Sequence, residues 1–315
     1  MNVVFLRAFF FAPSVLLASI LFSAFLGCNQ KAEPLTDSGK LQILVAVDPI
    51  VYMVERVGWE HIDVVALTPQ GQNPETYAPT PGSLQQVVAS RGFLRVGLPI
   101  EERFAKNIES IAPNAKTYDL CANLTLLPNP HRHDDGEHEG HEVHEDEEDV
   151  ESLDPHVWTS PANARVIVAN IADALEELDP VNAESYAANA EAFDAELASL
   201  QAEVGARLAP YEGKRFVVFH PAYGYFAREF KLEQAAIEFE GKAPRPKELQ
   251  KLIEQAKADG TRKLIVQPEF NRSSAQAIAD AIDGELVDHS PLEKDYFVNI
   301  RALTDAVVDS IGSQE

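Results

Sequence analysis

Basic residues are scarce in this 315-residue chain, which has 26 Lys and Arg against 50 Asp and Glu and a formal net charge of −24. Such an acidic chain repels nucleic acid and anionic membrane surfaces, so neither is expected as a partner. The same charge attracts cations. The hydrophobic fraction of 45% is that of an ordinary globular protein, so a folded α/β or similar domain structure is expected.

Cysteine is rarer still, with only Cys28 and Cys121 in the whole chain. Cys28 follows an N-terminal apolar segment that predicts lipid attachment, which leaves Cys121 alone. No intramolecular disulfide is therefore expected, although an extracytoplasmic compartment would allow one.

Motifs that would indicate an enzyme are missing as well. The sequence has no Gly-x-Ser-x-Gly nucleophile turn and no glycine-rich loop of the kind that cradles phosphate. The run His138-Glu139-Gly140-His141 lacks the spacing of a His-Glu-x-x-His zinc hydrolase. No catalytic residue is assigned, and a binding protein is expected instead of an enzyme.

The first 27 residues have the pattern of a lipoprotein signal peptide. Arg7 precedes an apolar stretch from Ala8 to Leu26, and Gly27-Cys28 resembles the site where the thiol is acylated and becomes the new N-terminus. Residues 28–40 then form a flexible tether. An uncleaved membrane anchor is the alternative, because about 19 mostly apolar residues approach the length of a membrane span. Either way, the rest of the chain is expected in the periplasm or at the cell surface, anchored to a membrane.

One segment is nearly all imidazole and carboxylate. Five of the nine histidines lie within residues 131–151, interleaved with Asp and Glu. Such a composition cannot bury a core, and neutral imidazole is a common ligand for borderline divalent ions. We expect an accessory loop that collects zinc weakly through His131, His133, His138, His141 and His144. A solvated acidic linker is the alternative, although a linker needs no histidine.

Short apolar runs alternate with helical stretches, which predicts an α/β fold with mainly parallel sheets. An N-terminal lobe is expected over residues 41–178, a long rigid linking helix over 179–208 and a C-terminal lobe over 211–315. Strands are predicted at 41–47, 62–67, 93–96, 115–118, 215–219, 232–237, 263–267 and 285–287. Helices other than the linking helix are predicted at 49–57, 81–89, 101–111, 161–178, 223–230, 246–258, 273–282 and 292–311.

Side chains that bind metals follow several of these strands. Glu75 lies on a proline-rich loop after the second strand, and His220 directly follows the fifth. His156 stands just before a predicted helix, and Asp288-His289 follows the last strand. Binding sites in parallel sheets lie at the carboxyl ends of the strands, although a lone histidine there is often only a structural hydrogen-bonding residue. One ligand from each of the four loops would make a four-coordinate site of nitrogen and oxygen donors.

Four sequence motifs, or blocks, surround these residues and indicate a family more specifically than composition does. They read Gly-x-x-Pro-x-Thr-Tyr-x-Pro-Thr-Pro from Gly71, Asp-Pro-His-Val-Trp from Asp154, Phe-His-Pro-Ala-Tyr-Gly-Tyr-Phe-Ala from Phe219 and Pro-Leu-x-x-Asp-Tyr from Pro291. In this order they resemble the TroA-like, ZnuA-like solute-binding proteins of zinc and manganese ABC importers. The resemblance covers the chain from about Leu41 to its end. It implies two α/β lobes bridged by a rigid helix, a metal ion buried between them and delivery of that ion to a membrane permease.

Two positions depart from that family's pattern. Glu75 stands where most members have histidine, and Ser290 stands where the family has aspartate directly before Pro-Leu. A two-residue insertion would bring Asp288 into the pocket; otherwise His289 or Glu269 would serve. The metal ligands expected from the resemblance are Glu75, His156, His220 and Asp288, with His289 and Glu269 as alternatives.

The expected function is capture of a divalent cation by a lipid-anchored monomer and delivery to an ABC permease in the cytoplasmic membrane. The histidine-rich loop favours zinc. A carboxylate in place of a third imidazole makes the donor set harder, which increases the preference for Mn²⁺ or Fe²⁺. An extracytoplasmic zinc buffer or a surface adhesin is the rival interpretation, because either would need the same anchor and loop. Adjacency of the gene to an ABC permease and ATPase would separate the two.

Overall fold

A computed structural model of the chain describes residues 39–129, 153–238, 246–258, 260–270 and 272–312. The predicted signal peptide with Cys28, nearly all of the tether and the histidine-rich loop at 131–151 lie outside the described residues. Residues 40–315 make up one compact unit. Within the part of the chain that the structure describes, every helix is too short or too polar to cross a bilayer.

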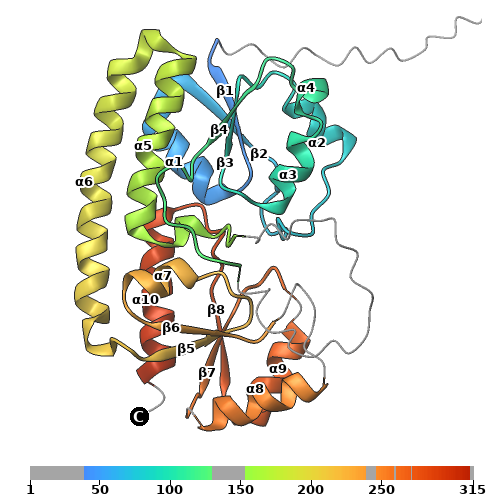
Figure 1. The fold of residues 1–315 in the computed structure, drawn as a ribbon, viewed down its shortest axis with the longest axis vertical. Helices are drawn as coiled ribbons and strands as arrows, with labels where there is room; N and C mark the ends of the chain where they lie inside the picture. The colour runs from blue at the N-terminus through green and yellow to red at the C-terminus, as the bar shows by residue number, and fades with distance from the viewer. Residues whose placement is uncertain (1–38, 130–152, 239–245, 259, 271, 313–315) are drawn as a thin grey trace, which may run out of the picture. The chain divides into compact units, whose positions relative to one another are not determined.

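The first four strands form a parallel sheet, shown in the upper half of Figure 1. Its strands are β1 (Leu41–Val45), β2 (Ile62–Ala66), β3 (Gly92–Arg95) and β4 (Lys116–Asp119), in the order β2-β1-β3-β4. Ile43, Leu44 and Val45 of β1 are completely buried, as expected for a strand that is covered on both faces. The helical connections are α1 (Asp48–Gly58), η1 (Trp59–His61), α2 (Pro81–Gln86), α3 (Pro99–Ala105) and α4 (Ile108–Ile111).

The last four strands repeat the same topology in a second parallel sheet (Figure 1). They are β5 (Arg215–Val218), β6 (Glu233–Ala236), β7 (Lys263–Val266) and β8 (Glu285–Asp288), in the order β6-β5-β7-β8. The helices of this lobe are α7 (Gly224–Glu229), α8 (Pro246–Ala258), α9 (Arg272–Ala281) and α10 (Tyr296–Gly312).

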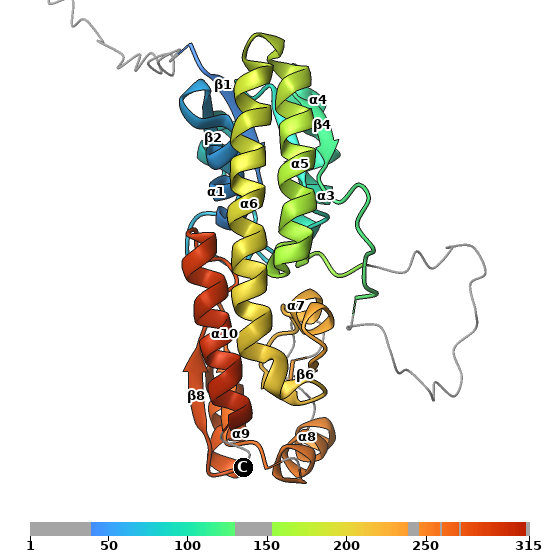
Figure 2. The ribbon, with the colours of Figure 1, turned by 90° about the vertical axis from the view of Figure 1, so that its left-hand side faces the viewer.

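A helical hairpin connects the two sheets. It consists of η3 (Val157–Thr159), α5 (Pro161–Leu178), η4 (Pro180–Asn182), α6 (Ala183–Leu208) and η5 (Ala209–Tyr211). Figure 2 shows α6 beside α5 along the N-terminal lobe and beside α10 along the C-terminal lobe, and these helices are in contact. The buried positions of α6 recur every three or four residues, which gives one continuous packing face: Tyr186, Ala190, Phe193, Leu197, Leu200, Val204 and Leu208.

The hydrophobic core is continuous across the lobe boundary. One cluster of buried side chains runs from the first sheet through α5 and α6 to Phe216, Val218 and Ile265 of the second sheet. The alternate strand residues Val217 and Leu264 belong to a separate, smaller cluster. Because successive side chains of a strand point to opposite faces, the second sheet divides these two cores.

The predicted fold of two parallel-sheet lobes and a long connecting helix is confirmed. Several helices differ from their predicted bounds. The helix expected at 81–89 ends at Gln86, the helix expected at 101–111 is divided into α3 and α4, and the linking helix begins at Ala183 instead of at residue 179. The last helix begins at Tyr296 instead of at residue 292. Asp295 explains the later start, because its Oδ1 accepts hydrogen bonds from the backbone N–H groups of Phe297 and Val298, both at 3.1 Å, and so caps the helix.

Candidate metal centre

Three donor side chains converge at the boundary between the two lobes. Glu75, on the loop after β2, and His156, just before η3, belong to the N-terminal lobe, whereas His220 directly follows β5 in the C-terminal lobe. One ligand atom from each of the three lies within 4.8 Å of the other two. Both histidines are buried. They are three of the four donors that are predicted from the sequence, the fourth being Asp288.

The distances between the donor atoms fit a small metal ion. Nε2 of His220 lies 3.4 Å from Nε2 of His156 and 3.4 Å from Oε1 of Glu75. Metal–ligand bonds of about 2.0–2.1 Å at tetrahedral angles place neighbouring ligand atoms about 3.3–3.4 Å apart, which is the usual geometry of zinc. Two of the three spacings are therefore those of tetrahedral edges, and the third, between His156 and Glu75, is at most 4.8 Å.

A buried carboxylate orients the His156 ring. Nδ1 of His156 lies 2.8 Å from Oδ1 of Asp154, and the same oxygen accepts the His156 backbone N–H at 3.0 Å. This pairing assigns the ring proton to Nδ1 and turns the lone pair of Nε2 toward His220. Two residues of the motif that begins at Phe219 contact Asp154. The Tyr225 hydroxyl donates to the Asp154 backbone carbonyl at 2.6 Å. Gly224 leaves room for the Asp154 carboxylate, because a Cβ at this position would lie 3.1 Å from Asp154 Oδ2.

A second buried carboxylate orients the His220 ring in the same way. Nδ1 of His220 lies 2.9 Å from Oε2 of Glu238, and Glu238 is 4% exposed. The backbone is fixed by Gln267, which accepts the His220 N–H at 3.1 Å and donates to the His220 carbonyl at 2.9 Å. Phe270 stacks on the imidazole, with ring centroids 4.5 Å apart. These contacts leave the ring a single orientation.

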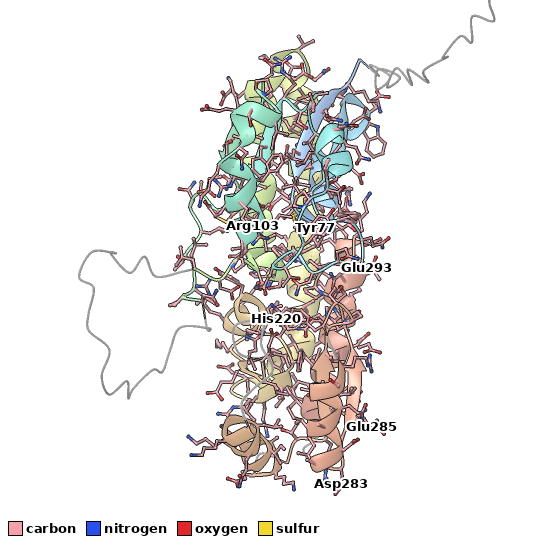
Figure 3. The ribbon with its side chains drawn as sticks, turned by 90° about the vertical axis from the view of Figure 1, so that its right-hand side faces the viewer. Tyr77, Arg103, His220, Asp283, Glu285 and Glu293 are labelled. Atoms are coloured by element: carbon pink, nitrogen blue, oxygen red, sulfur yellow. The ribbon has the colours of Figure 1, made fainter. Side chains whose placement is uncertain are left out.

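The Glu75 loop is tied to its own lobe by backbone contacts. The Glu75 N–H donates to Oδ1 of Asn73 at 2.8 Å, and the Arg103 guanidinium donates to the carbonyls of Glu75 at 3.3 Å and Tyr77 at 3.1 Å. Figure 3 shows Arg103 and Tyr77 at the edge of the N-terminal lobe that faces His220. Glu75 and Asp154 also line a cavity of about 770 Å³, so the centre has a solvent-facing side next to Glu75.

The negative charges around His156 control its protonation. Burial disfavours the charged ring, but the hydrogen bond and charge of Asp154, together with the charges of Glu75 and Glu238, outweigh burial and raise the pKa of His156 above its ordinary 6.5. The same charges that favour an imidazolium also favour a metal cation between the two rings. A proton and a metal ion therefore compete for Nε2.

Comparison with known proteins identifies the family. The family model for zinc-uptake complex component A, periplasmic, known as ZnuA, matches residues 43–310. The chain belongs to the ZnuA family. The membership that the four sequence blocks predict is thus confirmed.

Individual relatives agree with this assignment. A putative metal-binding protein of Treponema pallidum is 26% identical over 280 residues, which is 88% of each chain. The zinc-binding lipoprotein AdcA of Streptococcus pneumoniae is 27% identical over 282 residues, so the chain matches 52% of AdcA, about half of its length, with 86% of its own. A crystal structure of ZnuA has a TM-score of 0.77 at 31% identity, over 86% of this chain and 99% of the other.

The ZnuA-family protein does not bring the other predicted ligands to this centre. Asp288 has an exposed side chain that pairs with Arg272. Asp288 ends β8 and is exposed, whereas His289, the next residue, is buried. Glu269 instead accepts a hydrogen bond from Ser290.

His289 is used for packing within its own lobe of the ZnuA-family protein. Its Nδ1 lies 2.9 Å from the Tyr223 hydroxyl, and its Nε2 lies 3.2 Å from the Asn299 carbonyl. Burial lowers the pKa of His289 to about 4, against hydrogen bonding to Asn299, so the ring is neutral at ordinary pH. Both nitrogens face protein partners, which explains why the described structure does not place this histidine among the donors.

Sequence reasoning misses the two carboxylates that orient the imidazoles. Asp154 is part of a conspicuous block, and its place two residues before His156 is a usable signal, because an Asx turn places its carboxylate near the following backbone. Glu238 carries no such signal. It is 18 residues from its partner in the sequence and reaches His220 only because β5 and β6 pair in parallel.

Proposed function

We propose that this ZnuA-family protein captures zinc between its two lobes through Glu75, His156 and His220 and passes the ion to an ABC permease. The observation that carries the proposal is the convergence of these three donors from two lobes, with two donor distances of 3.4 Å. The proposed role consists of binding and release, without a chemical step, which agrees with the lack of catalytic motifs in the sequence.

Zinc is favoured over harder ions for two reasons. Two imidazoles and one carboxylate form a borderline donor set, and the donor spacing suits tetrahedral coordination better than an octahedron. Relatives with zinc in their names support the same choice. The carboxylate of Glu75 reduces this preference, because oxygen donors suit Mn²⁺ and Fe²⁺, and these two ions are the alternatives.

Delivery to a permease is compatible with the proposed location. A lipid on Cys28 would hold the mature chain at the membrane, and residues 29–40 would give it a short reach from that surface. The ZnuA family is described as a component of a zinc-uptake complex, which supports a permease partner. A zinc buffer or adhesin is the rival function. Genes for an ABC permease and ATPase beside this gene would favour delivery.

The test is zinc calorimetry on a double variant. Replacing His156 and His220 with alanine should abolish the tight site while circular dichroism stays unchanged, because neither imidazole is part of the hydrophobic core. A His61→Ala variant is the matched control, since His61 lies in the turn after α1 and contacts Tyr186 instead of the centre. Retention of the tight site in the double variant would refute the assignment.

A further inference from the structure

The turn that carries His156 is attached to the C-terminal lobe, although it belongs to the N-terminal lobe by its position in the chain. The Tyr225 hydroxyl of α7 donates to the Asp154 carbonyl at 2.6 Å. Nε1 of Trp158 donates to the Pro291 carbonyl, in the loop between β8 and α10, at 2.9 Å. Both donor side chains are buried, so the two hydrogen bonds are shielded from competing water.

Glu229, the last residue of α7, makes a further attachment at the start of α5. Its Oε2 accepts hydrogen bonds from the Ser160 hydroxyl and, at 3.1 Å, from the Ala162 N–H. The first N–H groups of a helix have no partner within the helix, so a carboxylate there satisfies a donor and faces the positive end of the helix dipole. Glu229 therefore caps α5 from the C-terminal lobe. Figure 2 shows α7 beside this end of α5.

The start of α5 is connected in turn to the backbone of His156. The Asn163 side chain donates to the Val157 carbonyl at 3.2 Å, and the Thr159 hydroxyl donates to the His156 carbonyl at 2.9 Å. The Asn163 N–H also donates to Oγ of Ser160 at 3.1 Å, and this is the same oxygen that donates to Glu229. A displacement of the first turn of α5 would therefore displace the His156 imidazole.

The helix that makes these attachments follows the other imidazole closely. Only residues 221–223 separate His220 from α7, and the Ala222 N–H donates to the His220 carbonyl at 2.8 Å. Tyr225 and Glu229 are four residues apart, so they lie on the same face of α7. One face of α7 thus contacts both the His156 turn and the start of α5.

We propose that Tyr225 and Glu229 are positioning residues of the metal centre, which set the distance between His156 and His220 without touching the ion. The two Nε2 atoms are 3.4 Å apart, a separation that suits a tetrahedral ion. Loss of either attachment lets the His156 turn move away from the helix that follows His220, so the imidazoles meet the ion in a poorer geometry. This inference rests on the proposed zinc site but assigns roles to residues outside it.

The test compares variants of the mature protein at the two ends of α5. Glu229→Ala removes a half-buried carboxylate at the start of the helix, and Asp179→Ala removes a half-buried carboxylate at its far end, where Asp179 accepts hydrogen bonds from Asn182 and Tyr186. Tyr225→Phe and the control Tyr186→Phe each remove one hydroxyl from a buried tyrosine at the same two places. Glu229→Gln keeps an acceptor oxygen for Ser160 and Ala162.

Zinc affinity is measured by competition with a chelator that strips weak sites, and coordination geometry by the visible absorption of one equivalent of Co²⁺. Glu229→Ala and Tyr225→Phe should each bind zinc about ten-fold more weakly, the low end of what the loss of a supporting contact around a metal costs. Both should also lose intensity in the Co²⁺ bands. Asp179→Ala and Tyr186→Phe should lower the melting temperature by similar amounts but keep the affinity and the spectrum. Glu229→Gln should bind zinc like the original protein.

Equal zinc affinities and equal Co²⁺ spectra within each matched pair would overturn the positioning role. A loss in Glu229→Gln as large as that in Glu229→Ala would overturn it for Glu229, because the charge and not the hydrogen bonds would then be responsible. Failure of the proposed function is distinguishable: in that case the His156→Ala, His220→Ala protein keeps the tight site, whatever the variants of α7 do.

Discussion

The two imidazoles of the centre are each held by a buried carboxylate. Asp154 faces Nδ1 of His156 and Glu238 faces Nδ1 of His220, at 2.8 and 2.9 Å. Such outer carboxylates fix the tautomer and increase the electron donation of the other ring nitrogen to a metal. The strength of the centre therefore depends on residues that do not touch the ion.

Glu238 gives the clearest test of this dependence. Glu238→Gln removes the charge but keeps an acceptor at nearly the same position, so zinc affinity should fall by about 10–100-fold without a change of fold. Calorimetry with one zinc equivalent measures the change. Glu233→Gln is the control, because Glu233 lies on β6, the strand just before Glu238, and is exposed beside Arg215. Equal zinc affinities in the two variants would show that Glu238 has no influence on the metal.

The pH dependence of zinc binding should follow Asp154. Because Asp154 raises the pKa of His156, protons begin to compete with zinc at a higher pH than for an ordinary histidine. In the Asp154→Asn variant, the effect of burial predominates and the pKa of His156 falls. Zinc binding should then be weaker at pH 8 but should decline less between pH 8 and pH 6. Titrations at several pH values should therefore show the affinity ratio of the two proteins shrinking on acidification. A ratio that is constant over this range contradicts the assigned role of Asp154.

Glu75 is expected to set the metal preference. Glu75→His would supply a third imidazole, which should increase selectivity for zinc over Mn²⁺ in a competition assay. Glu75→Ala should lower the affinity for both zinc and Mn²⁺, because it removes one of the three donors. If Glu75 points to solvent in solution, both variants will keep the original affinities and selectivity, and the carboxylate is then not a ligand.

Some residues of the centre can be placed from their own strand alone, and others depend on contacts between distant segments. His220 and Glu75 each follow a strand, so the sequence places each of them at the carboxyl-end edge of its own sheet, whereas the approach of the two edges was expected only from the family resemblance. Asp288 could not be placed, because it adjoins His289 at the end of β8 and the sequence does not decide which of the two neighbours is buried. Glu238 could not be found at all, since its contact depends on the pairing of β5 with β6.

Among the elements, helices with clear end signals are predicted well. Ser160 accepts the Asn163 N–H at 3.1 Å and Pro161 occupies the first turn of α5, as the Ser-Pro pair indicates. The last helix is placed four residues too early, because the apolar pattern continues through Leu292 while Asp295 provides the cap. Apolar periodicity gives the existence of a helix, and the cap gives its first residue.

The histidine-rich loop leaves and rejoins the described structure at one place. Pro128 and Leu153 form an isolated antiparallel bridge, and the Asp154 N–H donates to the Leu127 carbonyl at 2.9 Å. Replacing residues 131–148 with a short glycine-serine linker should therefore leave Asp154 and His156 in position. We expect fewer zinc ions per chain, an unchanged tight site and nearly the same melting temperature. A fall of many degrees would mean that the loop is part of the fold.

At the scale of the whole described unit, Lys40–Glu315, the alternation of strands and helices predicts both lobes but not how they meet. The lobes are joined by α6, which packs on α1, α5 and α10 and is tied to α10 by ion pairs such as Arg301–Glu203 at 2.7 Å. Such contacts join residues nearly one hundred positions apart, and no local pattern encodes them. The centre is therefore a property of the assembled lobes, with His220 on one side and Glu75 and His156 on the other.

We propose that one zinc ion is bound across the lobes by two imidazoles and a carboxylate. X-ray absorption at the zinc edge can count these ligands in protein that carries the glycine-serine linker in place of residues 131–148 and one equivalent of zinc. We expect a four-coordinate ion with two imidazole nitrogens and otherwise oxygen, and loss of the imidazole scattering when His156→Ala and His220→Ala are added. Three or more imidazoles in the first protein, or an unchanged spectrum in the second, would contradict it.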